Sequence, residues 1–131
     1  MRVRTFKPQF APLVQSGVKR QTIRPIPKGR QPRPGDLESW REWTGRPYGS
    51  PQRELARVKI ISIEHFKLDE TPREILASFP DRPLKGALMP IAQWNAFAQA
   101  DGFKSFSEMV LWFEKNHGLP FTGIVIKVED V

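Results

Sequence analysis

The strongest constraint on the fold is the segment from Leu55 to Phe66, which has the composition of a central β-strand. Its β-branched aliphatic residues are Val58, Ile60, Ile61 and Ile63. Such residues fit the pleated surface of a sheet, and successive side chains of a strand point to opposite faces. The β-branched run therefore predicts a place in the middle of a small barrel, with the charged residues of the strand at the rim or toward solvent.

Four further strands and four helices are expected along the chain. The strands cover residues 2–7, 19–24, 37–43 and 121–128, and the helices cover residues 9–16, a stretch after Thr71, residues 90–100 and a stretch after Ser105. This order predicts an α+β fold: a small mixed β-barrel with a short helix after the first strand and a helical pair before the last. The chain has no internal repeat and no composition break, so residues 1–131 are expected to form one domain.

Capping patterns locate two of these helices. Ser105 followed by Glu108, and Thr71 followed by Glu74, have the spacing of a capping box. Apolar residues at helical spacing after Ser105 are expected to form the inner stripe of that helix, with Trp112 alongside: Phe106, Met109, Val110 and Phe113. Residues 79–88 contain two prolines and a glycine, and we expect an irregular excursion there.

The segment from Gly17 to Arg24 concentrates cations around a threonine. Gly17 stands where the short helix is expected to end, a position that commonly needs a positive φ. Strict alternation from residue 19 places Arg20, Thr22 and Arg24 on one side of the following strand and Lys19 on the other. The two arginines carry planar donors suited to phosphate or to a base edge.

The charge of the chain is unevenly distributed. Residues 1–57 contain 13 Lys and Arg against 4 Asp and Glu, a net charge of +9, and residues 58–131 contain 8 against 10, a net charge of −2. A basic half of this kind indicates a basic face and a polyanionic partner. We expect a nucleic acid or nucleotide rather than a membrane surface, because no basic amphipathic helix is apparent.

Several classes of protein are disfavoured. The absence of Cys excludes disulfides and cysteine-ligated metals, and no apolar run approaches the length of a membrane span. The N-terminus has no apolar stretch typical of a signal peptide, so a cytoplasmic location is expected. His65 and His117 belong to no metal-binding motif and are interpreted as a rim residue and a helix-end residue.

The sequence resembles the ASCH domain, a member of the PUA-like superfamily of small β-barrels. The resemblance rests on Gly-x-Lys-x-x-Thr-Ile-Arg from Gly17 to Arg24, on Pro-Gly-Asp at residues 34–36, and on residues 100–105 followed by Glu108. A closing strand over residues 121–128 follows in the family's order, so the resemblance spans nearly the whole chain. It implies a PUA-like barrel.

The resemblance also implies two kinds of activity. Some small ASCH proteins remove the acetyl group from acetylcytidine with a Lys, a Thr and a Glu, which places those roles on Lys19, Thr22 and Asp101 here, with Asp in place of Glu. A Thr hydroxyl needs a neighbouring base, and a Lys serves as one only if desolvation or nearby cations lower its pKa; Arg20 and Arg24 are the candidate cations. The assignment requires Lys19 to lie in the turn before the strand, because strict alternation would point it away from Thr22.

Other ASCH relatives are associated with RNA binding or with cleavage of single-stranded RNA. In that version Lys19 and Arg24 hold the phosphate, Tyr48 stacks on a base or assists proton transfer, and a divalent metal is a possible cofactor, although no carboxylate cluster is visible. Aromatic residues interleaved with arginines are what unpaired bases stack on. The further candidate contacts are Arg20, Arg41, Trp43 and Arg46.

Three functions therefore remain open. The first is an RNA- or nucleotide-binding domain with a basic cleft around Gly17–Arg24, and the second is a hydrolase acting on a modified nucleoside or on RNA. The third is a protein-binding adaptor that docks through Trp40, Trp43 and the Pro-rich residues 25–34. No cofactor is expected for the first.

Overall fold

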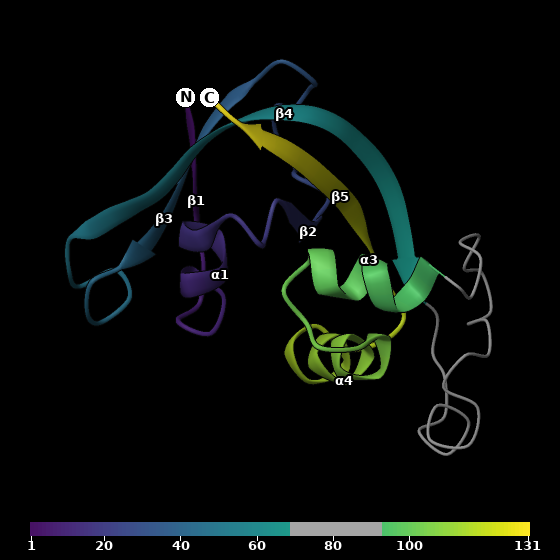
Figure 1. Cartoon of the computed structure of the whole chain (residues 1–131). Coiled ribbons are helices and arrows are strands. Elements are labelled where there is room, and N and C mark those ends of the chain that lie inside the picture. Colours follow the sequence, from purple (N-terminus) through teal and green to yellow (C-terminus); the bar gives the residue numbers. More distant parts are fainter. Residues whose placement is uncertain (69–92) are drawn as a thin grey trace.

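A strongly curved sheet of five strands organises the computed structural model, which describes residues 1–68 and 93–131 (Figure 1). The elements are β1 (Arg2–Thr5), α1 (Ala11–Ser16), β2 (Gln21–Pro25), β3 (Leu37–Trp43), β4 (Gln52–Leu68), α3 (Trp94–Ala100), α4 (Phe106–Asn116) and β5 (Phe121–Asp130). The helix expected after Thr71, the excursion at residues 79–88 and the expected helix start at residue 90 lie outside the described residues.

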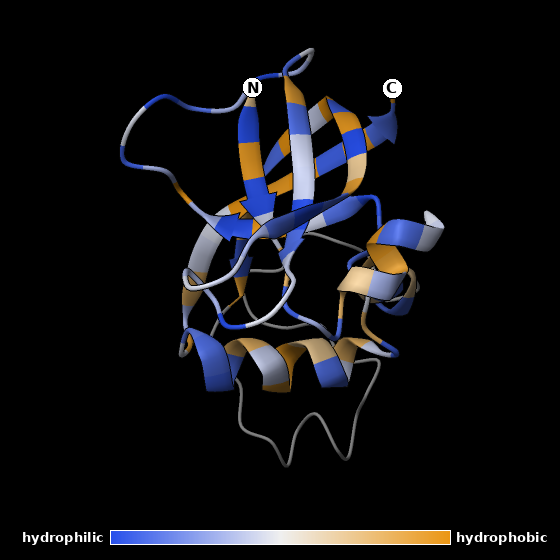
Figure 2. Ribbon diagram, turned by 90° about the vertical axis from the view of Figure 1, so that its left-hand side faces the viewer, coloured by the Kyte–Doolittle hydropathy of each residue, from blue (hydrophilic) through white to orange (hydrophobic). Residues whose placement is uncertain are grey.

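The strands are ordered β1-β3-β4-β5-β2. The β1–β3 pair is parallel and the other three pairs are antiparallel. The fold is thus α+β with a mixed, half-barrel sheet, which confirms the fold class at this level. In Figure 2 hydrophilic and hydrophobic residues alternate along the strands, as expected when one face is buried.

The longest strand, β4, is central as predicted, because it pairs with β3 along its first part and with β5 along the rest. Val58 and Ile60 are buried, but Ile61 is exposed. The pairing with β5 shifts register between Ile60 and Ser62, so that Ile61 is the extra residue of a bulge. Bulges bend a strand, and β4 arches over the other elements in Figure 1.

The helices close the concave side of the sheet and complete one core. The inner stripe predicted for α4 is confirmed: Phe106, Met109, Val110 and Phe113 are all buried. Ser105 caps this helix by accepting a hydrogen bond from the Glu108 backbone N–H. None of the helices within the described residues is long and apolar enough to cross a membrane.

The boundaries of some elements differ from the predictions for local reasons. Helix α1 starts at Ala11, and Pro12 is accommodated within its first turn. Strand β2 begins at Gln21 rather than at residue 19, which changes the geometry of the site described below. Strand β5 extends to Asp130 and lies between β4 and β2, and residues 123–126 are all buried although their side chains alternate between the two faces.

Candidate functional site

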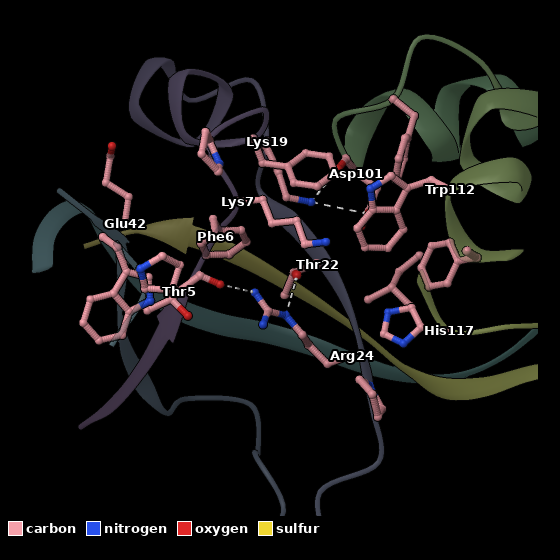
Figure 3. A pocket seen from close by; sticks show the side chains of 18 of the residues that line it. Thr5, Phe6, Lys7, Lys19, Thr22, Arg24, Glu42, Asp101, Trp112 and His117 are labelled. Atoms are coloured by element: carbon pink, nitrogen blue, oxygen red, sulfur yellow. Dashed lines mark hydrogen bonds and ion pairs between the residues drawn. The ribbon is translucent and has the colours of Figure 1, made fainter. Parts of the chain in front are cut away.

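A pocket of about 460 Å³ opens between the end of β1, strand β2 and the C-terminal part of α4. Five of its polar lining residues are Lys7, Lys19, Thr22, Arg24 and Asp101 (Figure 3). The end of β3 and the loop after it contribute further lining residues: Glu42, Trp43, Gly45, Pro47 and Tyr48. Segments distant in sequence therefore meet at one cavity.

Lys19 reaches this pocket because it lies in the connection before β2 rather than in the strand. Gly17 ends α1 with a φ of +88°, and the Lys19 backbone N–H then donates to the Leu13 carbonyl, 3.0 Å away. Residue 19 therefore lies outside β2, in which side chains alternate between the two faces of the sheet from Gln21 onward. Lys19 and Thr22 consequently line the same pocket, as the predicted assignment required.

The Lys19 ammonium group is almost fully buried and is held by oxygen atoms. Its Nζ donates to the Gln21 carbonyl oxygen at 2.8 Å and to the Asp101 carbonyl oxygen, and it lies 3.4 Å from Asp101 Oδ2. It also lies 5.0 Å from the ring centre of Phe10. Burial lowers the pKa of Lys19 to about 8; Asp101 opposes this shift and Arg24 adds to it.

Asp101 follows α3 directly, and its side chain points toward Lys19 and Gln21. Its Oδ1 accepts a hydrogen bond from Gln21 Nε2 at 3.3 Å. Gly102 continues the chain with a φ of +100°, and a Cβ there would lie 3.3 Å from Lys19 Cδ. Burial raises the pKa of Asp101 to about 6, against the opposing effect of Lys19. The Asp101 side chain is one methylene shorter than the Glu that the resemblance implies, but it still lies within ion-pair distance of Lys19.

Arg24 orients Thr22 and joins the two edges of the sheet. Its Nε donates to Thr22 Oγ1 at 3.1 Å and its Nη2 to the Thr5 carbonyl oxygen at 3.0 Å, at the end of the opposite edge strand β1. The guanidinium lies 4.8 Å from the ring centre of Phe6. Burial, followed by the charge of Arg4, lowers the pKa of Arg24 to about 10.

Lys19 and Thr22 are not hydrogen-bonded to each other within the described chain. Lys19 Nζ is engaged with Gln21 and Asp101, and Thr22 Oγ1 accepts from Arg24. The Thr22 hydroxyl therefore keeps its own proton to donate. The arrangement offers one hydroxyl, one lysine of lowered pKa and one guanidinium to whatever occupies the pocket.

Aromatic rings form much of the remaining wall. Phe10 and Trp112 meet edge to face, with ring centres 5.7 Å apart. At the mouth Tyr48 is 89% exposed and lies 5.1 Å from the Trp43 ring. Its φ is +60°, which is strained for a bulky residue. The loop thus holds an aromatic ring out at the mouth of the pocket.

Three of the predicted contact residues lie elsewhere. Arg20 is turned toward the C-terminal end of β5, where its guanidinium lies 2.8 Å from Asp130 Oδ1. It does not contribute to the shift of the Lys19 pKa. Arg41 bonds to Ser39 and Gln52 along the sheet. Neither lines the pocket, and the exposed Arg46 is flanked by lining residues but is not one of them.

The structure also adds residues that the sequence did not single out. Lys7, Trp112 and His117 all line the pocket. Trp112 was expected only beside the inner stripe of α4, and His117 only at the end of that helix. No local pattern connects these residues with Lys19, because only tertiary packing brings the end of α4 to the start of α1.

The tryptophan positions bear on the adaptor hypothesis. Trp40 is fully buried and donates to Glu38 Oε1 at 3.1 Å, so it cannot dock on a partner. Trp43 is half-buried at the pocket. Within residues 1–68 and 93–131 no group of three His, Asp or Glu side chains is placed to hold a metal ion.

The architecture and the site define a small α+β protein with a basic, aromatic-walled pocket at the edge of a half-barrel. Neither a family model nor a curated protein matches the chain. The fold is similar to that in the crystal structure of the hypothetical protein PH0355, with a TM-score of 0.53, 19% sequence identity and full coverage of both chains. At this identity the similarity concerns the fold alone.

Proposed function

We propose that the chain is an ASCH-type domain of the PUA-like superfamily, and that its pocket binds a nucleotide, either free or as part of a single RNA strand. The observation that carries the proposal is the convergence of Lys19, Thr22, Arg24 and Asp101 at one aromatic-walled cavity. These are the positions that the ASCH resemblance had singled out.

The shape and lining of the pocket support a ligand with a base. A cavity of about 460 Å³ falls within the range of small-molecule sites. Its aromatic walls suit a planar heterocycle, while buried donors and acceptors supply polar contacts. The exposed Tyr48, packed on Trp43, offers a second stacking surface for a neighbouring base.

Binding of fluorescently labelled single-stranded RNA over a series of salt concentrations tests the proposal. Affinity should fall steeply with salt, because basic side chains displace counterions from the phosphates. Arg24→Gln should weaken binding about tenfold or more, the scale of a lost charge-assisted hydrogen bond. The matched control is Arg57→Gln, which removes the same charge from the basic half at an exposed position outside the pocket. Equal effects of the two substitutions would contradict a pocket-centred site.

A hydrolase is the second candidate, favoured by the lowered pKa of Lys19. At neutral pH a lysine with a pKa of about 8 is neutral far more often than an ordinary lysine, and a neutral amine can accept the proton of a hydroxyl or a water. The Thr22 hydroxyl, oriented by Arg24, is the nearby nucleophile of this candidate.

Incubation with acetylcytidine, with release of cytidine followed by chromatography, tests the second candidate. Lys19→Met should abolish turnover, and Thr22→Val should reduce it strongly. Turnover retained in both variants would refute the assignment of Lys19 and Thr22 as catalytic residues. The absence of turnover in the unmodified protein would rule out this activity, and nucleotide binding would remain as the proposed function.

A further inference from the structure

Two cationic side chains and a histidine, from separate parts of the chain, lie around the mouth of the pocket. Lys7 follows β1, Arg24 lies on β2 and His117 follows α4, and all three line the cavity (Figure 3). They are close enough to interact, because Lys7 and Arg24 both lower the pKa of His117, in addition to the larger effect of burial.

The hydrogen-bond partners of Lys7 and Arg24 are uncharged groups. Lys7 Nζ donates to Asn116 Oδ1 at 2.7 Å, and Arg24 donates to the Thr22 hydroxyl and to a backbone carbonyl. None of the ion pairs between described residues involves Lys7, Arg24 or His117.

The two carboxylates of the pocket are engaged with other cations. Asp101 is paired with Lys19, and Glu42 lies 2.9 Å from Arg53. Asp101 and Glu38 do act on Arg24 through their charge, but burial and the nearby Arg4 outweigh them. The mouth therefore carries an excess of positive charge that the described part of the chain does not neutralise.

Such an arrangement is suited to an anion that accepts several hydrogen bonds. A phosphate group has oxygen atoms enough to accept from a guanidinium, an ammonium and an imidazole together. Lys7 and His117 are exposed, so a phosphate at the mouth stays partly in water while the rest of the ligand enters the pocket.

We infer that Lys7, Arg24 and His117 form a phosphate subsite, so that the pocket takes a phosphorylated nucleoside in preference to the neutral nucleoside. The inference rests on the proposed function and specifies its ligand class. The phosphate belongs either to a nucleoside monophosphate or to the backbone of an RNA strand.

Isothermal titration calorimetry at constant ionic strength tests the inference. The probes are the four ribonucleosides, their 5′- and 3′-monophosphates, and the corresponding dinucleoside monophosphates. At least one phosphorylated probe should bind about tenfold more tightly than its nucleoside, the scale of one charge-assisted contact. Tighter binding of the dinucleoside monophosphate would assign the subsite to an RNA backbone, and tighter binding of a mononucleotide to a free nucleotide.

Two variants and a control separate the subsite from general electrostatics. Lys7→Gln and His117→Gln should each lower the affinity for the phosphorylated probe by a larger factor than the affinity for the nucleoside. Lys115→Gln removes an exposed charge from the last turn of α4, outside the pocket, and should change neither. Circular dichroism of each variant checks that the fold is retained.

The outcomes distinguish this inference from the function on which it rests. Equal affinity for nucleoside and monophosphate, or equal effects of Lys7→Gln and Lys115→Gln, would overturn the phosphate subsite and leave a nucleoside pocket. No binding of any probe would overturn both.

Discussion

The burial of Lys19 predicts that the protein becomes more stable as the pH rises above neutrality. The pKa of Lys19 is about 8 in the folded chain and 10.5 in its ordinary state. Between these values the unfolded chain binds a proton that the folded chain has lost, so the free energy of unfolding increases with pH. The stability that Lys19 contributes above pH 10.5 is lost as the pH falls through about 8.

The magnitude follows from the size of the shift. One pKa unit corresponds to about 1.4 kcal/mol, so the change from 10.5 to about 8 gives a rise of about 3 kcal/mol across this interval. A gain of that size is a large part of the stability of a small domain.

Urea unfolding at several pH values between about 8 and 10.5 measures the effect. Trp40 is fully buried, so tryptophan fluorescence reports unfolding. Lys19→Met should remove the rise whatever its effect on the absolute stability, and Lys115→Met, at an exposed position, should retain it. A flat or falling profile in the unmodified protein, or an unchanged rise in Lys19→Met, would refute the interpretation of Lys19 as a desolvated lysine.

Three further predictions concern neighbouring parts of the site. Burial raises the pKa of Asp101 from 3.8 to about 6, so the free energy of unfolding should fall as the pH rises between these values, and Asp101→Asn should abolish that fall in the same urea assay. Gly102→Ala adds a Cβ 3.3 Å from Lys19 Cδ at a φ of +100°, and it should lower stability by about 1–2 kcal/mol in thermal unfolding; an unchanged midpoint would contradict the strain argued at this position. Tyr48→Ala should weaken binding of single-stranded RNA by about 1–3 kcal/mol, the scale of one stacked base, while affinity for a mononucleotide changes less; equal losses for both ligands would place Tyr48 inside the pocket rather than at a flanking base.

The parts of the fold that local patterns determine could be predicted from the sequence. The β-branched run of β4 identified the central strand, and the stripe of α4 identified its buried face, because each pattern follows the period of its own element. Ile61 was misjudged, since a bulge depends on the pairing with β5 and leaves no mark in the alternation of β4.

The candidate site was predictable only where its residues share one motif. Lys19, Thr22 and Arg24 lie close together in sequence, and they do line one pocket. Arg20 was wrongly grouped with them, because the strand begins two residues later than alternation suggested and its guanidinium turns to Asp130. The approach of His117 results from how α4 packs under the sheet, which no single segment encodes.

The central claim, that this pocket is the binding site for a nucleotide, can be tested directly by nuclear magnetic resonance. The chain has four tryptophans, of which Trp43 and Trp112 line the pocket and Trp40 and Trp94 do not. Addition of a ribonucleoside monophosphate to ¹⁵N-labelled protein should shift the indole N–H signals of Trp43 and Trp112 in a saturable manner and leave those of Trp40 and Trp94 in place. Signals that remain unchanged, or that change only at Trp40 and Trp94, would contradict the claim.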